Sequence, residues 1–544
     1  MNQKLIFLLV LTLALVLRFY KLGSYPVSLS WDEVAIGYNA YSIAKTGTDE
    51  YGAKWPILFK SFNDYKLPGY VYLDSFFVKI FGLSEFSVRA PSALFGVIAV
   101  FLVYFLTKEI FLKMGNRLDT FSLLPPIVTT LLSISPWHLQ LSRAAFESNT
   151  SLTIVLGGLL LLFLGMRNKL AATLSIPTLA LSIYFYYSPR VFVPLIVIFF
   201  LIIFKSEIAR SFKYYLYGLV LSILILIPIT IQILSPQGLK RVREVSIFED
   251  KSLVVEYVEA RAKTDNLLSV IFLNRRIPIV FETLSNYFSH FSFDFLFFGS
   301  DPNPRHRTSF HGSLYLFEIP LLIMGFWYLA RKVPRSTKYF LIVWLLIAPI
   351  PAALSRETPH GLRSLLLLPP LLILVSLGAS EAVKRWGRIK LVFGTVILVF
   401  FVNYLYSYYL LYPQKDSLPW AYGYKEMFKE VLGLESNFDR VIVTGSYWKP
   451  YIFYLFYNKI DPRFYQFQGS QQSIGKYRFG IAGWDSGGKD LDETSIDSLK
   501  SGKTLLVISP GEFQNIDTKE RFKKLSTVSD YSGKQDVFLI GEWR

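Results

Sequence analysis

The two adjacent carboxylates Asp32 and Glu33 are the residues best suited to chemistry in this sequence, and they stand directly after Trp31. A carboxylate can act as a general base when a like-charged neighbour and partial loss of water tune its pKa. The same pair also has a structural explanation. Ser30 or Asp32 can cap a helix over residues 34–44, in whose first turn Glu33 would be favourable. The spacing alone leaves both interpretations open.

A second charged run carries Asp64 and Lys66 and precedes a short apolar segment over residues 70–82. That segment has about thirteen residues, too few to cross a bilayer, and it contains two charges. We therefore expect a helix that lies in the membrane interface. A lysine at its start can reach a lipid headgroup or bind a phosphate as a point charge. An ordinary interfacial anchor explains Lys66 equally well.

A third group, His138, Arg143 and Glu147, lies between two apolar segments. Arg143 and Glu147 are four positions apart, so they can share one helical face and form a local ion pair. Alternatively, Glu147 is a second acidic residue that meets Asp32 across a cavity, orients an acceptor hydroxyl or binds a cation.

Further cations and histidines stand near the ends of apolar segments that are far apart in the sequence. A charge just inside a membrane span is costly unless it faces a polar cavity or reaches the interface. The second explanation suffices for any one of these residues. Together they can hold the phosphate or pyrophosphate of a lipid headgroup. The set is Arg190, Arg305, His306, Arg307, His360 and Arg363.

The sequence does not favour a zinc enzyme. It contains no cysteine, which excludes disulfides and thiolate metal sites. His138, His306, His311 and His360 have none of the spacings of a recognisable zinc motif. The sequence therefore leaves metal use open. It indicates no required cofactor, but Asp32, Glu147 and a histidine together are a possible set of ligands for a divalent cation.

Long apolar runs must position these residues. The chain has 544 residues, 52% of them hydrophobic, and the apolar residues come in nearly uninterrupted stretches. Such stretches indicate membrane-spanning helices, because the backbone must satisfy its own hydrogen bonds in hydrocarbon. The fold class expected is an α-helical polytopic membrane protein. The predicted spans are 3–20, 91–110, 121–137, 149–166, 170–187, 190–204, 214–235, 313–330, 338–355, 363–383 and 390–411.

The basic residues set the orientation of these spans. With a cytoplasmic N-terminus, every short Lys- and Arg-rich connection falls on the inside, as the positive-inside rule requires. The net charge of +17 therefore indicates topology rather than a nucleic-acid surface. The inside connections are 108–119, 166–169, 205–213, 331–338 and 384–390.

The opposite, extracytoplasmic side receives a first outer loop over 21–90, a large outer loop over 236–312 and the tail 412–544. Long loops are uncommon unless they are functional. The tail has the composition of a soluble domain, which we predict to be a small α/β domain separate from the transmembrane domain 1–411. Its predicted strands are 441–444, 504–508 and 537–540, and its predicted helices are 422–432 and 450–456.

Three features together resemble the GT-C membrane glycosyltransferases of the protein O-mannosyltransferase and aminoarabinose-transferase type. The first is the acidic pair Asp32-Glu33 in a long first outer loop. The second is Lys66-Leu67-Pro68 before an interfacial helix, although relatives have a doubled proline there. The third is Arg89-Ala90-Pro91-Ser92-Ala93 at the start of the second span. The resemblance is specific over about residues 1–165 and only architectural beyond them.

The resemblance implies inverting transfer of a sugar from a polyprenyl-phosphate donor to a hydroxyl on a protein, lipid or glycan acceptor. It makes Asp32 the general base, Glu33 its partner, and Lys66 a contact of the donor phosphate. Glu147 would lie near the acceptor, where relatives often have Asp. Arg190, Arg305, Arg307 and Arg363 are further candidates for phosphate binding, and Asp64, His138, Arg143, His306 and His360 for lining the cavity.

Two alternatives stay open. A transporter or flippase of lipid-linked sugars would also have many spans and a charged cavity, but no internal repeat or pair of broken helices is visible. A ligase that uses polyprenyl-pyrophosphate glycans would share the architecture. The enzyme prediction requires that the carboxylates and cations converge on one outward-opening pocket that lipid can reach.

Overall fold

The computed structural model describes residues 3–544 except 63, 113–122, 237, 240–245, 250–254, 256–258, 260–275, 300, 388, 448, 481–501 and 517–518. Parts of the predicted connection 108–119 and of the large outer loop 236–312 therefore lie outside the described residues. The chain forms two compact units. The helical unit comprises Met1–Tyr20 and Ser92–Ser407, and the loop–tail unit comprises Lys21–Pro91 and Tyr408–Arg544. The predicted domain boundary at 411 stays a prediction.

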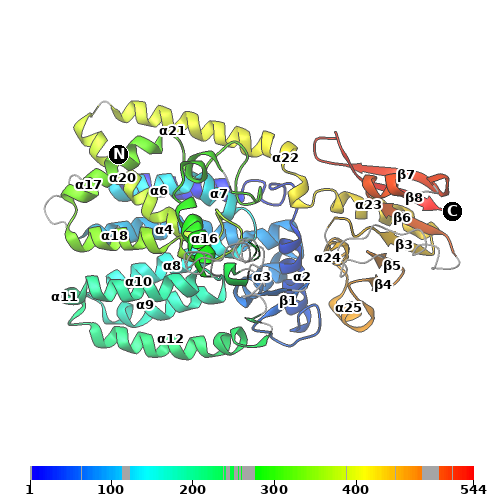
Figure 1. Ribbon diagram of the computed structural model, residues 1–544, viewed down its shortest axis with the longest axis horizontal. Helices are drawn as coiled ribbons and strands as arrows, with labels where there is room; N and C mark the ends of the chain where they lie inside the picture. The colour runs from blue at the N-terminus through cyan, green and yellow to red at the C-terminus, as the bar shows by residue number, and fades with distance from the viewer. Residues whose placement is uncertain are drawn as a thin grey trace. The chain divides into compact units, whose positions relative to one another are not determined.

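The helical unit is a bundle of long apolar helices (Figure 1). It contains α1 (Gln3–Phe19), the greater part of α4 (Glu85–Phe111), α6 (Leu124–Ile134), α7 (Pro136–Ser142), α8 (Glu147–Leu164), α9 (Lys169–Leu181), α10 (Pro189–Ile203), α11 (Lys205–Ile208), α12 (Phe212–Ile233), α16 (Arg276–Ser289), α17 (Glu318–Lys332), α18 (Arg335–Ile347), α19 (Ile350–Ala353), α20 (Leu368–Arg385) and α21 (Ile389–Tyr406).

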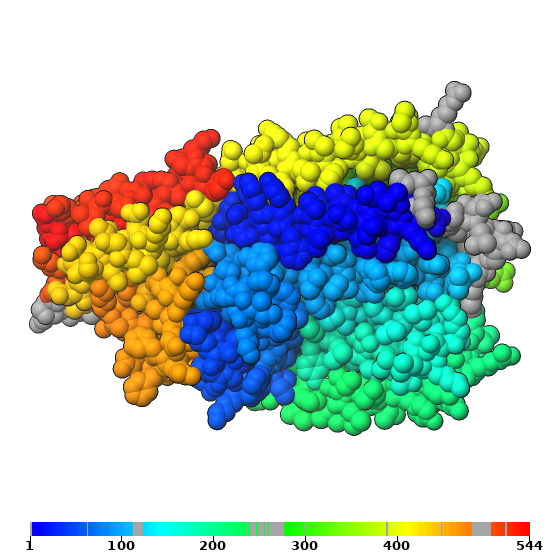
Figure 2. Space-filling view, turned by 180° about the vertical axis from the view of Figure 1, so that it is seen from behind, coloured from blue at the N-terminus to red at the C-terminus, as the bar shows by residue number. Residues whose placement is uncertain are grey.

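A helix lies on each of the predicted spans. Six helical segments of the described chain are long and apolar enough to cross a membrane, and three shorter helices are also apolar. The chain is therefore a multi-pass membrane protein, as predicted, while the number of spans stays a prediction. Figure 2 shows α1 in deep blue along one face of the bundle. Leu8 and Leu9 of this helix are exposed. Apolar side chains on such a surface suit contact with lipid.

The centre of the bundle is α20, which is buried along most of its length. It packs against α17 and α6. Two glycines allow the backbones of α17 and α20 to meet, because a Cβ atom on Gly325 or on Gly378 would lie 2.0 Å from a carbonyl oxygen of the facing helix. Small residues have this role at helix contacts in membranes.

The loop–tail unit combines the first outer loop with the tail. Its helices are α2 (Trp31–Thr46), α3 (Pro68–Phe81), α22 (Tyr412–Lys415), α23 (Tyr424–Leu434), α24 (Pro450–Tyr457), α25 (Pro462–Gln468) and α27 (Pro510–Asn515). Its strands are β1 (Phe59–Ser61), β2 (Asp64–Lys66), β3 (Arg440–Val443), β4 (Ser473–Ile474), β5 (Tyr477–Phe479), β6 (Thr504–Ile508), β7 (Phe522–Ser529) and β8 (Asp536–Trp543).

The tail folds around a six-stranded sheet in the order β4-β5-β3-β6-β8-β7. Strand β3 is parallel to β5 and β6, and the outer pairings are antiparallel. Every residue of β6 is buried, as expected for a central strand. The predicted small α/β domain is confirmed, with β3, β6 and β8 on its three predicted strands. Strands β4, β5 and β7 were missed because they are short or largely polar.

The first outer loop consists of two helices and a hairpin. The predicted interfacial helix is α3, which begins at Pro68, and it packs against α2. Strands β1 and β2 pair antiparallel, with Phe59 opposite Lys66. The hairpin thus ends at Lys66, one residue before the N-cap of α3.

Candidate functional site

The start of α2 is fixed by a capping box. Ser30 is the N-cap, its Oγ accepts from the backbone N–H of Glu33, and the Glu33 carboxylate accepts from the backbone N–H of Ser30 at 2.9 Å. This arrangement satisfies two N–H groups that the helix itself leaves open. The prediction that Ser30 caps this helix is therefore confirmed, and Glu33 in the first turn is part of the cap.

Glu33 is also one half of a buried ion pair with Arg89. Arg89 Nε lies 2.9 Å from Glu33 Oε1, and neither side chain is more than 1% exposed. Arg89 Nη1 donates to the carbonyls of Leu22 and Pro26, and Nη2 donates to the carbonyl of Ser28 and to Glu33 Oε2. One arginine therefore connects the start of α4 to the cap of α2 and to the chain that leads into it.

Asp32 has different surroundings, although it is the next residue to Glu33. Its carboxylate forms an ion pair of 2.5 Å with Lys66 Nζ, and its side chain is 38% exposed. The hairpin positions this lysine, because Lys66 is the last residue of β2. Asp64 is on the same strand, and its carboxylate accepts from the backbone N–H of Tyr65. Two of the residues predicted to act together, Asp32 and Lys66, are thus in direct contact.

In the helical unit, His138 and Arg143 join helix ends. Arg143 donates to the carbonyls of Leu17, Arg18 and Tyr20 at the C-terminal end of α1. Arg18 in turn donates to the carbonyls of Leu132 and Ser133 at the end of α6 and lies 2.6 Å from His138 Nδ1. Carbonyls at helix ends lack partners within the helix, and these arginines supply them. These contacts explain His138 and Arg143 without a substrate.

Among the predicted phosphate ligands, Arg190 and Arg363 have buried guanidinium nitrogens that form no hydrogen bond with the described residues. These atoms are Nε and Nη2 of Arg190 and Nη1 of Arg363. Ser188 Oγ donates to the carbonyl of Arg363 at 2.7 Å, so the start of α10 and the segment around residue 363 are in contact. Buried cationic N–H groups of this kind are suited to an anionic ligand.

The other cations near this segment have protein partners. Arg305 Nε donates to Asn303 at 3.3 Å, and Arg307 Nε donates to the carbonyl of Asp301 at 2.9 Å.

The predicted acidic residue Glu147 is the first residue of α8, where the helix dipole favours its charge.

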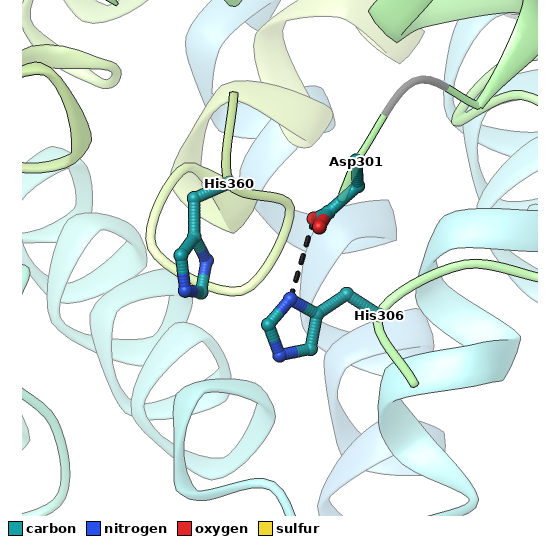
Figure 3. A group of neighbouring side chains, drawn as sticks. All are labelled: Asp301, His306 and His360. Atoms are coloured by element: carbon teal, nitrogen blue, oxygen red, sulfur yellow. Dashed lines mark hydrogen bonds and ion pairs between the residues drawn. The ribbon is translucent and has the colours of Figure 1, made fainter. Parts of the chain in front are cut away.

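His306 and His360 lie close to Asp301. Asp301 belongs to the large outer loop 236–312, as His306 does, and was not among the predicted site residues. The two imidazole centroids are 4.5 Å apart, and His306 Nδ1 lies 3.3 Å from Asp301 Oδ2 (Figure 3). All three side chains are buried. The backbone N–H of Gly361 donates to Asp301 Oδ2 at 2.6 Å.

Burial and neighbouring groups set the charges of this cluster. Burial alone would raise the pKa of Asp301, but the His306 ring and the N–H groups of Gly361 and Asn303 outweigh it and lower this pKa. Burial lowers the pKa of His360 well below its usual value, and His306 and Arg363 lower it further. At neutral pH the cluster thus combines a carboxylate with a neutral imidazole.

Comparisons with known proteins agree with the predicted resemblance. Residues 66–231 match the family model described as dolichyl-phosphate-mannose-protein mannosyltransferase. No curated protein matches the chain in sequence. The crystal structure of ArnT from Cupriavidus metallidurans bound to undecaprenyl phosphate is 10% identical and has a TM-score of 0.58, with 98% of this chain and 97% of that chain covered.

A second solved structure is the Archaeoglobus fulgidus oligosaccharyltransferase tethered to an acceptor peptide. It is 14% identical with a TM-score of 0.53, and the alignment covers 93% of this chain and 69% of that chain. The chain has the fold of the GT-C membrane glycosyltransferases. The predicted fold class, an α-helical polytopic membrane protein of GT-C type, is confirmed.

The predicted site residues divide between the two units. The loop–tail unit contains Asp32, Glu33, Asp64 and Lys66, and the helical unit contains the others.

Two residues that contact predicted site residues were not predicted from the sequence. They are Arg89, which pairs with Glu33, and Asp301, which contacts His306. Arg89 stands in the motif that carried the resemblance, but nothing in the sequence shows that its partner is Glu33. Asp301 is separated from His360 by several helices. The convergence of the two sets of residues on one pocket stays a prediction.

The Asp32–Lys66 pair should contribute little to stability. We expect Asp32→Asn and Lys66→Met each to change the free energy of unfolding by less than about 1 kcal/mol, because a partly exposed ion pair has little net value. Denaturation of the detergent-solubilised chain measures this. A loss of about 2 kcal/mol or more would show that the pair is structural.

Proposed function

We propose that this chain is an inverting glycosyltransferase that moves a sugar from a polyprenyl-phosphate donor to a hydroxyl acceptor on the extracytoplasmic side of the membrane. The observation that carries the proposal is the contact between Asp32 and Lys66. A base and a phosphate-binding cation are the two groups that this reaction needs at its reacting bond.

The environments of the two carboxylates support the choice of Asp32 as the base. Glu33 is buried and held by Arg89 and Ser30, so it has little freedom to accept a substrate proton. Asp32 is partly exposed, and its partner is Lys66 at the end of β2. We therefore assign Glu33 to positioning: through the cap of α2 it fixes the backbone that presents Asp32.

Asp32 and Lys66 act in a single displacement. The acceptor oxygen attacks the anomeric carbon while the bond from that carbon to the phosphate oxygen breaks. The acceptor proton passes to the Asp32 carboxylate, and the bonding electrons leave with the polyprenyl phosphate. Lys66 stabilises the charge that develops on the departing phosphate, and single displacement inverts the anomeric configuration.

The helical unit contains further cations that suit an anionic lipid. We include Arg190 and Arg363, which have buried guanidinium nitrogens without hydrogen bonds among the described residues, and we retain Arg305 and Arg307 as further candidates for donor phosphate binding. Glu147 stays the proposed acceptor-side acid, and Asp64, His306 and His360 stay proposed cavity residues. We leave His138 and Arg143 out of the site because Arg143 donates to carbonyls at the end of α1 and the His138 ring contacts Arg18. The ArnT structure with undecaprenyl phosphate supports a lipid phosphate as the ligand class.

Sugar transfer in detergent tests this proposal. The purified chain is supplied with undecaprenyl-phosphate-linked hexoses and pentoses and with a membrane extract as the source of acceptor, and released undecaprenyl phosphate is measured. We expect Asp32→Asn to lower kcat at least about a hundredfold, because it removes the general base. Lys66→Met should raise KM for the donor about tenfold or more, because it removes a charged contact to phosphate.

The matched control is Lys60→Met, a lysine on the paired strand β1 whose Nζ lies 4.7 Å from the Tyr51 ring. It should retain wild-type transfer. Wild-type rates in Asp32→Asn, or retained anomeric configuration in the product, would contradict the mechanism. Scrambling of the lipid donor in liposomes without sugar transfer would instead indicate a flippase.

Single cysteines test the predicted orientation, because the chain contains none. Ser206→Cys lies in the predicted inside connection, and Ser470→Cys lies in the tail. A membrane-impermeant maleimide should label Ser470→Cys in intact cells and Ser206→Cys only after permeabilisation. The reverse pattern would place the tail in the cytoplasm and overturn the assignment of sides.

A further inference from the structure

The cluster Asp301, His306 and His360 has the composition of a metal centre. Each side chain offers one ligand atom, and these atoms all lie within 4.8 Å of one another. In Figure 3 the two imidazole rings lie beside each other, and the Asp301 carboxylate is directed at His306. Among the residues that the structure describes, no other group of three histidines and carboxylates meets this spacing.

Two imidazoles and one carboxylate are ligands that divalent first-row transition metals accept. Sites with three protein ligands of this kind leave a position open for water or substrate. Bonds of about 2.0–2.1 Å to zinc would require these groups to move inward by about 1 Å, which side-chain rotation can supply.

The ring nitrogens are available for such a change. His306 Nδ1 and His360 Nδ1 each have a partner at 3.3 Å, namely Asp301 and the backbone N–H of Arg363. Both contacts are long for hydrogen bonds, and His360 Nδ1 is the acceptor in its contact, as a nitrogen with a free lone pair must be. Nε2 of each ring has no hydrogen-bond partner within the described part of the chain.

Surrounding groups hold the ligands in place. Asp301 Oδ1 accepts from the backbone N–H of Asn303 at 2.8 Å, in addition to the bond from Gly361 to Oδ2. Trp137 Nε1 donates to the Gly361 carbonyl at 3.0 Å, and the backbone N–H of His360 donates to His290 Nε2 at 3.1 Å. Outer contacts of this kind orient metal ligands before the ion binds.

We propose that Asp301, His306 and His360 form a site for one divalent transition-metal ion, with zinc as its probe. The site lies wholly within the helical unit. The proposal does not depend on the assignment of Asp32 and Lys66, and its test does not use sugar transfer.

Metal content measures the site directly. The full chain in detergent is treated with EDTA, incubated with ZnCl2, desalted and analysed by mass spectrometry for zinc. We expect about one zinc ion per wild-type chain, and at least about a tenfold lower content in His306→Gln, His360→Gln and Asp301→Asn, because each change removes one of only three protein ligands.

The matched control is His311→Gln. This histidine is also buried in the helical unit, but its Nε2 lies 3.1 Å from Ser407 Oγ, outside the cluster. It should retain the wild-type zinc content. Zinc that is absent from the wild type, or that stays with all three cluster variants, would overturn the proposal.

Cobalt keeps the test decisive if a cluster variant fails to fold. Wild-type chain loaded with Co²⁺ should show the visible absorption of a four-coordinate site with nitrogen and oxygen ligands. A spectrum of six-coordinate Co²⁺ only, or no binding, would overturn the proposal without any variant.

Discussion

The buried ion pair between Glu33 and Arg89 is the interaction on which the organisation of the first outer loop depends. Arg89 uses its guanidinium to hold Glu33 and three backbone carbonyls, and Glu33 also closes the capping box of α2. Removing two charges from water costs several kcal/mol, and only nearly complete hydrogen bonding offsets that cost. Because both side chains are almost fully buried, the geometry around them has little freedom.

This ion pair gives the adjacent carboxylates Glu33 and Asp32 different surroundings. The one that completes the ion pair is fixed and shielded, and the other, Asp32, remains at the surface beside Lys66. An arrangement of this kind positions a carboxylate accurately without burying it. Arg18 and Arg143 apply the same principle in the helical unit, where each connects helix ends through backbone carbonyls.

The sequence predicted the features that are local or that depend on composition. Apolar runs placed the helices of the bundle, the run from Ser30 to Glu33 allowed a helix cap, and short strand-like segments predicted the central strands of the tail. The contacts between Arg89 and Glu33 and between Asp301 and Gly361 join residues that are far apart in the chain. No periodicity or spacing records such contacts, because they arise from packing of the helices. Polar edge strands such as β7 were missed because their exposed residues dilute the hydrophobic pattern.

A double-mutant cycle between Glu33 and Arg89 tests the central constraint most directly. The free energy of unfolding is measured for the wild type, Glu33→Gln, Arg89→Met and the double variant in the same detergent. We predict that each single change costs about 3 kcal/mol or more, because it leaves a buried charge or polar group without its partner. The double variant should be less unstable than the sum by about 2–3 kcal/mol. Losses that simply add, within about 0.5 kcal/mol, would contradict the account.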